Sequence, residues 1–223
     1  METLLQALAQ YMGEIPMFPL PQIVFFPHTI LPLHIFEPRY RQMIRDMRDQ
    51  GLPIVMGNVK PGQVVDAQGR PEVFPVAGVG FMTKCEELPD GRFLVELDGL
   101  ARVEILEEHD TQKLYRLVKV ALRPDEDDDP TQAQERLETL QVLVMSLGQQ
   151  NERVGGYLQQ LLRKAPTPSA AADSIAAAIV SDPSVRQSLL EETSVLKRLD
   201  VVVSRMAELL ALAARADKGT PLN

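Results

Sequence analysis

Few residues of this chain have the types and spacing that catalysis requires. Cys85, the one cysteine, could act as a nucleophile only if a base lies near it in space, and a buried or half-buried cysteine in a strand is the simpler interpretation. Ser194 and Lys197 lie one helical turn apart and could form a Ser–Lys pair, but no oxyanion hole is evident beside them. The sequence therefore predicts no catalytic residue.

Metal binding is the second chemistry to consider. A tetrahedral site needs three or four clustered ligands, and the histidines lack that spacing; they are His28, His34 and His109. Three alternate aspartates resemble the first ligands of a calcium loop; they are Asp125, Asp127 and Asp129. However, Pro130 stands where that loop needs glycine and Arg136 where it needs glutamate. We expect no metal site and interpret the acidic run as a solvated linker.

Motifs for cofactor binding and hydrolysis are incomplete or missing in this sequence. Gly78-Val79-Gly80 begins like a dinucleotide-binding fingerprint, but Thr83 occupies the position of the third glycine, so a β-bulge is the favoured interpretation. The 223 residues contain no G-x-x-x-x-G-K-[ST] phosphate loop, no G-x-S-x-G and no H-E-x-x-H. We therefore predict a chain that is not an enzyme and that binds no cofactor.

The composition indicates which class of protein this chain is. Hydrophobic content of 45% and charged content of 24% are ordinary for a globular protein, and no apolar run approaches the ~20 residues of a membrane span. A lone cysteine and a poor match to a signal peptide favour the cytoplasm. Five of the eight net negative charges lie in residues 125–129, and no dominant basic face is visible, which argues against nucleic-acid binding.

The chain changes character near residue 124. All seven phenylalanines lie at or before Phe93, whereas every serine lies at or beyond Ser146. Short strands and turns are expected before this point and helices with 3–4 periodicity after it. We predict a β-rich domain over residues 1–123, an acidic linker over 124–130, a helical domain over 131–216 and a disordered tail over 217–223.

The most distinctive stretch is Ile15–Met47. Its first part holds many prolines among apolar residues, which predicts short strands joined by rigid turns. A helix should follow, with Pro38 at its first position and Gly51 just past its end. Four residues at i, i+3, i+4 and i+7 form its apolar face; they are Tyr40, Met43, Ile44 and Met47.

This stretch, from FPLPQIVFFP to LPLHIFEPRYRQMI, resembles the start of the Lon amino-terminal domain, the substrate-binding module of ATP-dependent Lon proteases. FPVAGVGFMTKCEELPDGRFLVELDGLARVEILEE is similar to a later section of that domain, which carries a G-x-x-R element. The resemblance implies an α+β fold: a small β-barrel-like (PUA-like) domain with one internal helix, followed by an α-helical bundle. It implies a stand-alone module without the ATPase and peptidase parts.

The residues that carry the resemblance are expected to be structural; they are Pro27, Pro32, Leu33, Phe36, Glu37, Pro38, Arg39, Tyr40, Gly99 and Arg102. Arg39 could fasten the predicted helix to the sheet or contact a partner. For partner binding the candidates are Val24, Phe25 and Phe26, because three consecutive apolar residues of an alternating strand cannot all face one core. The alternative is that both faces of this strand are covered.

The resulting functional hypothesis is a non-catalytic module that binds unfolded polypeptides or a protein partner, in protein quality control or as an adaptor. It could also form homo-oligomers, and a membrane is not expected among its partners. Two alternatives stay open: a nucleic-acid-binding protein related to PUA domains, for which residues 39–48 would have to form a basic patch, and an ATP-independent peptidase.

Overall fold

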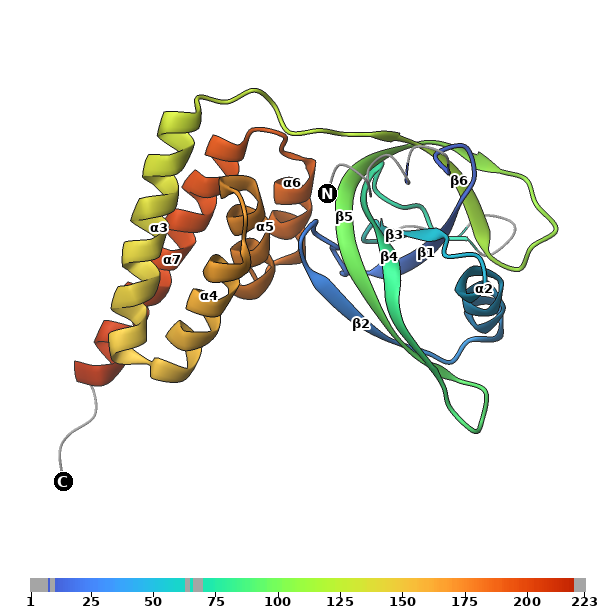
Figure 1. The fold of residues 1–223 in the computed structure, drawn as a ribbon, viewed down its shortest axis with the longest axis horizontal. Coiled ribbons are helices and arrows are strands. Elements are labelled where there is room, and N and C mark those ends of the chain that lie inside the picture. Colours follow the sequence, from blue (N-terminus) through green and yellow to red (C-terminus); the bar gives the residue numbers. More distant parts are fainter. Residues whose placement is uncertain (1–7, 9–10, 63–64, 66–69, 219–223) are drawn as a thin grey trace. The chain divides into compact units, whose positions relative to one another are not determined.

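The computed structural model describes residues 8, 11–62, 65 and 70–218. Two units are present, Met1–Pro124 with the strands and Asp125–Asn223 with most of the helices (Figure 1). The α+β class predicted from the sequence is confirmed. Within the described residues no helix has the length and apolar character needed to cross a membrane.

Among the described residues the sheet unit contains six strands: β1 (Ile15–Pro21), β2 (Ile30–Ile35), β3 (Pro53–Val59), β4 (Val76–Glu87), β5 (Phe93–His109) and β6 (Arg116–Leu122). Their order is β2-β5-β4-β3-β1-β6; β1 and β3 run parallel, and the other pairs of described strands are antiparallel. The long strand β5 pairs with β2, β4 and β6. The barrel-like part is therefore a mixed sheet that curves until β6 also reaches β5.

Helix α2 (Pro38–Arg48) forms as its periodicity predicts. Proline is its first residue, and all four predicted apolar residues are buried. Gly51, just past the end, has a φ of 61°, a conformation that glycine adopts without steric cost. On its other side, Asp46 accepts hydrogen bonds from the Tyr115 hydroxyl (2.7 Å) and the Lys113 ammonium (2.8 Å), which fasten the helix to residues that precede β6.

The segment between β1 and β2 is a loop and not the expected strand. Gln22 and His28, at its two ends, have φ values of 62° and 60°, which are unusual for residues other than glycine. The His28 N–H donates to the Gly99 carbonyl (2.8 Å), and the Gly99 N–H donates to the Thr29 carbonyl (2.8 Å). The loop is thus tied to the middle of β5.

Glycines of β4 and β5 make room for this loop. A Cβ atom on Gly78 would overlap the carbonyl oxygen of Phe25, and one on Gly99 would overlap that of Phe26. The register of β4 against β5 shifts between Val79 and Gly80, so the predicted bulge at the Gly-Val-Gly motif is confirmed.

The helical unit contains α3 (Pro130–Gln150), α4 (Glu152–Lys164), α5 (Pro168–Ile179), α6 (Pro183–Glu191) and α7 (Val195–Lys218). Asp182 caps α6, as an aspartate directly before a proline at the first helical position indicates, and its carboxylate accepts from the Ser184 and Val185 N–H groups. Thr167 caps α5, because Pro168 occupies the first helical position and the Thr167 hydroxyl accepts from the Ala170 N–H. Residues 217 and 218 extend α7, and the rest of the predicted tail lies outside the described residues.

Candidate functional site

The Ser–Lys pair considered from the sequence is not assembled. The Ser194 hydroxyl donates to the Asp128 carboxylate (3.2 Å) and accepts from the Lys197 backbone N–H (3.2 Å), so it caps the first turn of α7. The Lys197 ammonium lies 3.6 Å from Glu192 Oε2. Ser194 and Lys197 therefore have structural partners, and neither is arranged as a nucleophile with its base.

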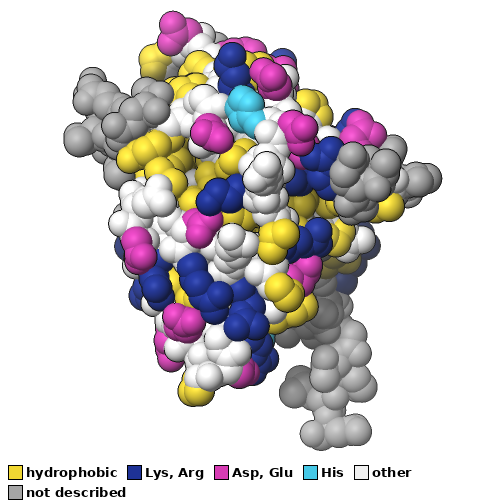
Figure 2. Space-filling view, turned by 90° about the vertical axis from the view of Figure 1, so that its right-hand side faces the viewer, with side chains coloured by type: hydrophobic (Ala, Val, Ile, Leu, Met, Phe, Trp, Pro, Cys, Tyr) yellow, Lys and Arg dark blue, Asp and Glu magenta, His cyan; other side chains and the backbone are white. Residues whose placement is uncertain are grey.

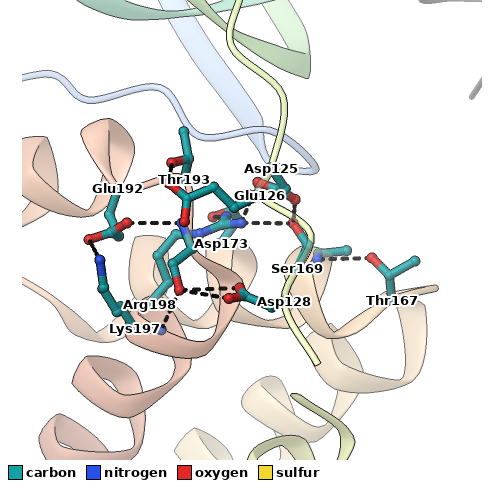
Figure 3. Close-up of polar contacts among 12 residues, drawn as sticks. Asp125, Glu126, Asp128, Thr167, Ser169, Asp173, Glu192, Thr193, Lys197 and Arg198 are labelled. Carbon is teal, nitrogen blue, oxygen red and sulfur yellow. Dashed lines mark hydrogen bonds and ion pairs between the residues drawn. The ribbon is translucent and has the colours of Figure 1, made fainter. Parts of the chain in front are cut away.

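The acidic run is not the solvated linker that its composition indicates. Arg198 of α7, 1% exposed, donates to Asp173 of α5 (2.6 Å) and also binds Asp125. Ser169 donates to the second oxygen of Asp125 (Figure 3). The composition was misleading because the acids remain largely exposed while their oxygens meet a buried guanidinium and helix N–H groups. The segment belongs to the helical unit.

Cys85 and the histidines also have structural surroundings. Cys85 pairs with Val95 across β4 and β5, and burial raises the pKa of its thiol, which lowers the fraction of reactive thiolate. His109 contacts the Gly13 carbonyl (2.7 Å), and His34 lies on the surface of β2. Among the described residues no group of three or more His, Cys, Asp or Glu is placed to hold a metal ion.

The predicted contact residues Val24, Phe25 and Phe26 do not form a surface. Their exposed fractions are 4%, 2% and 1%. These three residues lie in a loop and not in an alternating strand, so the irregular backbone lets all three side chains point inward. The prediction of partner binding at these residues is wrong, and the covered alternative describes them.

The residues that carry the family resemblance fall into two groups. Buried ones shape the sheet unit: the Tyr40 ring packs against that of Phe18 with centroids 4.1 Å apart, and Arg102 is 4% exposed. Arg39 pairs with Glu37 at the start of α2 (2.8 Å), so it braces its own segment and not the sheet. By contrast, Phe36 is 61% exposed and Pro32 is exposed on β2. These two apolar residues need a different explanation.

Phe36 and Pro32 belong to a larger surface, here called the outer face, formed by one side of β2, β5 and β4. The pairing places its residues in three rows: Ile30, Asp98 and Phe81; Pro32, Glu96 and Lys84; His34, Leu94 and Glu86. Phe36 extends the β2 column, its ring 6.1 Å from that of His34. Ile30 is 65% exposed and Leu94 43%. The outer face therefore exposes several apolar side chains that lie together.

This surface is hollowed and lies beside an unpaired strand edge. A groove of about 690 Å³ is lined by residues that include Pro32, Leu33, Lys84 and Leu94. Within the described residues β2 pairs only with β5, so its other edge carries no neighbouring strand. Sequence reasoning missed Ile30 and Leu94. The available signal was ILPLHI, which is apolar at nearly every position and so must show apolar residues on both faces of a strand.

The side of the molecule that carries α2 has a surface of mixed charge (Figure 2). Lys and Arg side chains gather on the side that carries this helix, with acidic side chains among them. Arg45 and Arg48 both lie within 3.4 Å of Glu87, and Arg48 also pairs with Asp49 (3.3 Å). A surface that binds nucleic acid needs cations left over for phosphates. The predicted condition for the nucleic-acid alternative, an isolated basic patch, is not met here.

Comparison with known proteins identifies the family of this chain. The model of the ATP-dependent protease La (LON) substrate-binding domain matches residues 14–208. The chain belongs to this family. The Lon protease of Heliobacterium modesticaldum is 26% identical over 222 residues, which cover 93% of this chain and 26% of that protein. The Lon protease of Escherichia coli K12 is 26% identical over 200 residues, 86% of this chain and 24% of that protein. This Lon-type chain thus spans about a quarter of the length of these relatives.

Solved structures share the fold. A Lon N-terminal domain protein from Xanthomonas campestris superimposes with a TM-score of 0.61 at 21% identity, covering 86% of this chain and 98% of that one. The N-terminal domain of the Mycobacterium avium complex Lon protease gives a TM-score of 0.65 at 15% identity, covering 87% and 98%. At these identities the similarity establishes the fold alone.

Proposed function

We propose that this Lon-type chain is a non-catalytic module that binds unfolded polypeptides through the outer face. The observation that carries the proposal is the group of exposed apolar side chains along β2 and on the neighbouring strand β5, formed by Ile30, Pro32, Phe36 and Leu94. Contiguous exposed apolar surface on a folded unit is typical of an interaction site. Membership of a substrate-binding domain family supports a polypeptide as the ligand.

The strand geometry suits an extended ligand. Residues on one side of a strand repeat about every 7 Å, which matches the repeat of side chains along an extended peptide. The apolar side chains of such a peptide would cover Ile30, Leu94 and Phe36 and remove their surface from water, which is favourable by about 25 cal/mol per Å². A folded protein hides its apolar residues, so this face would favour unfolded segments. We place this role in protein quality control in the cytoplasm.

Binding can be measured by fluorescence anisotropy of labelled, unfolded casein. Phe36→Ser and Leu94→Ser should each weaken binding about tenfold, the loss expected where a few large apolar residues carry most of the binding energy. The matched control is Leu106→Ser, since Leu106 is 54% exposed on the same strand β5 but lies outside the outer face. Equal affinities for all three variants and the unaltered protein would overturn the proposal.

A further inference from the structure

The outer face carries an uneven distribution of charge. Its three carboxylates belong to Glu86, Glu96 and Asp98, and its one ammonium group to Lys84. Lys84 Nζ lies 2.8 Å from Glu96 Oε2, so this pair is internally compensated. Glu86 and Asp98 are exposed, and the described part of the chain supplies neither with an ion-pair partner. Two negative charges therefore remain beside the apolar residues.

The spacing of these two charges can be derived from the strand pairing. Asp98 lies in the row of Ile30 and Phe81, and Glu86 lies two rows away, in the row of Leu94. Two rows correspond to four residues along a strand, or about 13 Å, and neighbouring strands are about 5 Å apart. The two carboxylates are thus separated by about 14 Å, close to the distance between residues i and i+4 of an extended peptide.

From this arrangement we propose that the outer face selects extended polypeptide segments with an apolar centre flanked by Lys or Arg at positions i and i+4. This inference rests on the proposed function and adds the chemistry of the ligand. Each cation would lie against Asp98 or Glu86, while the apolar centre lies over the row between them, which holds Pro32 and the methylene groups of the compensated pair Lys84 and Glu96. Segments with acidic residues at the same two positions would be repelled by the same carboxylates.

Three labelled peptides that share one apolar centre test this selection. They carry Lys, Gln or Glu at both flanking positions. In 20 mM salt the Lys peptide should bind about tenfold more tightly than the Gln peptide and the Glu peptide more weakly still, as two exposed charge pairs allow. In 0.5 M salt the three affinities should converge, because exposed charges are then screened within about 4 Å.

Variants connect the selection to the two carboxylates. Asp98→Asn combined with Glu86→Gln should remove the preference, so that the Lys and Gln peptides bind this double variant with equal affinity. The control, Glu104→Gln with Glu107→Gln, alters two exposed acids of β5 outside the outer face and should keep the preference. Equal binding of all three peptides to the unaltered protein would overturn the charge selection but not the proposed function. If none of the peptides and no casein bound, the proposed function itself would fall.

Discussion

Two apolar segments lie on either side of the turn at His28 and have opposite environments. The buried run, Val24–Phe26, is at most 4% exposed. The outer stripe consists of the outward-facing residues of β2 and the position just after it: Ile30, Pro32, His34 and Phe36. Its two end residues, Ile30 and Phe36, are each more than 60% exposed. Composition does not distinguish the two segments, because both are apolar and both contain or adjoin proline.

Their backbones explain the difference. The buried run lies in a loop, whose irregular backbone lets successive side chains all point inward. The outer stripe lies in and just beyond a regular strand, where alternate side chains must face opposite sides. The inward-facing residues of β2, Leu31 and Leu33, pack on the core. The residues that alternate with them must therefore face outward. An apolar residue on a strand surface is therefore a stronger sign of binding than an apolar residue in a loop.

The largest effect is expected where the buried run meets β4. Gly78→Ala would place a methyl group on the Phe25 carbonyl, and backbone cannot move aside as a flexible side chain can. We expect a loss of more than about 4 kcal/mol in the free energy of unfolding, or no folded sheet unit at all. Urea denaturation followed by circular dichroism measures this.

Gly13→Ala is the control for this change, because nothing lies within 4 Å of its added Cβ. It should alter stability by less than about 0.5 kcal/mol. A Gly78→Ala protein as stable as the Gly13→Ala protein would show that the loop is not held by close approach to β4.

The next effect compares the two segments directly. Phe25→Ala leaves a cavity in the core and should cost about 3–5 kcal/mol. Phe36→Ala removes a ring that is mostly in water already and should cost less than about 0.5 kcal/mol. When casein affinity is compared per folded molecule, the order of the two variants should reverse, and Phe36→Ala should weaken binding more than Phe25→Ala. Similar stability losses in both variants would mean that the outer stripe is covered in solution.

Local patterns in the sequence predicted much of this fold. The period of Tyr40, Met43, Ile44 and Met47 is set by a single helix, and the cap at Asp182 involves residues two and three positions away. The bulge at Gly78-Val79-Gly80 was also accessible, because two glycines within a strand suggest an irregularity. Features of this kind depend on neighbours in the chain.

The candidate site was predicted poorly from the sequence because it depends on contacts between residues that are far apart in the chain. Burial of Phe25 requires glycines more than fifty residues away on β4 and β5. Arg198 meets Asp125 and Asp173 only after α5 and α7 have packed together, so composition alone made the acidic run look solvated. The outer face depends on the pairing register of three strands. A shift of one residue in a strand would turn its outward-facing side chains to the buried side of the sheet.

The smallest effect concerns the helix that follows the outer stripe. Tyr115 fastens α2 by donating to Asp46 (2.7 Å). Burial, together with the neighbouring Asp46 carboxylate, raises the pKa of Tyr115 from 10.0 to about 12. A group whose pKa is raised by folding stabilises the fold fully below its unfolded value and loses that contribution as the pH rises through the folded value. The contribution of Tyr115 should therefore be constant up to about pH 10 and disappear towards pH 12.

Tyr115→Phe tests this fastening. At pH 8 it should lower the free energy of unfolding by about 1 kcal/mol, the value of one hydrogen bond. Between pH 10 and 12 the unaltered protein should lose this advantage, so the two stability curves converge even though other groups also titrate there. Tyr157→Phe, at a tyrosine that is 56% exposed, should leave the curve unchanged. A Tyr115→Phe curve that stays parallel to that of the unaltered protein up to pH 12 would mean that the ring, and not its hydroxyl, holds α2 in place.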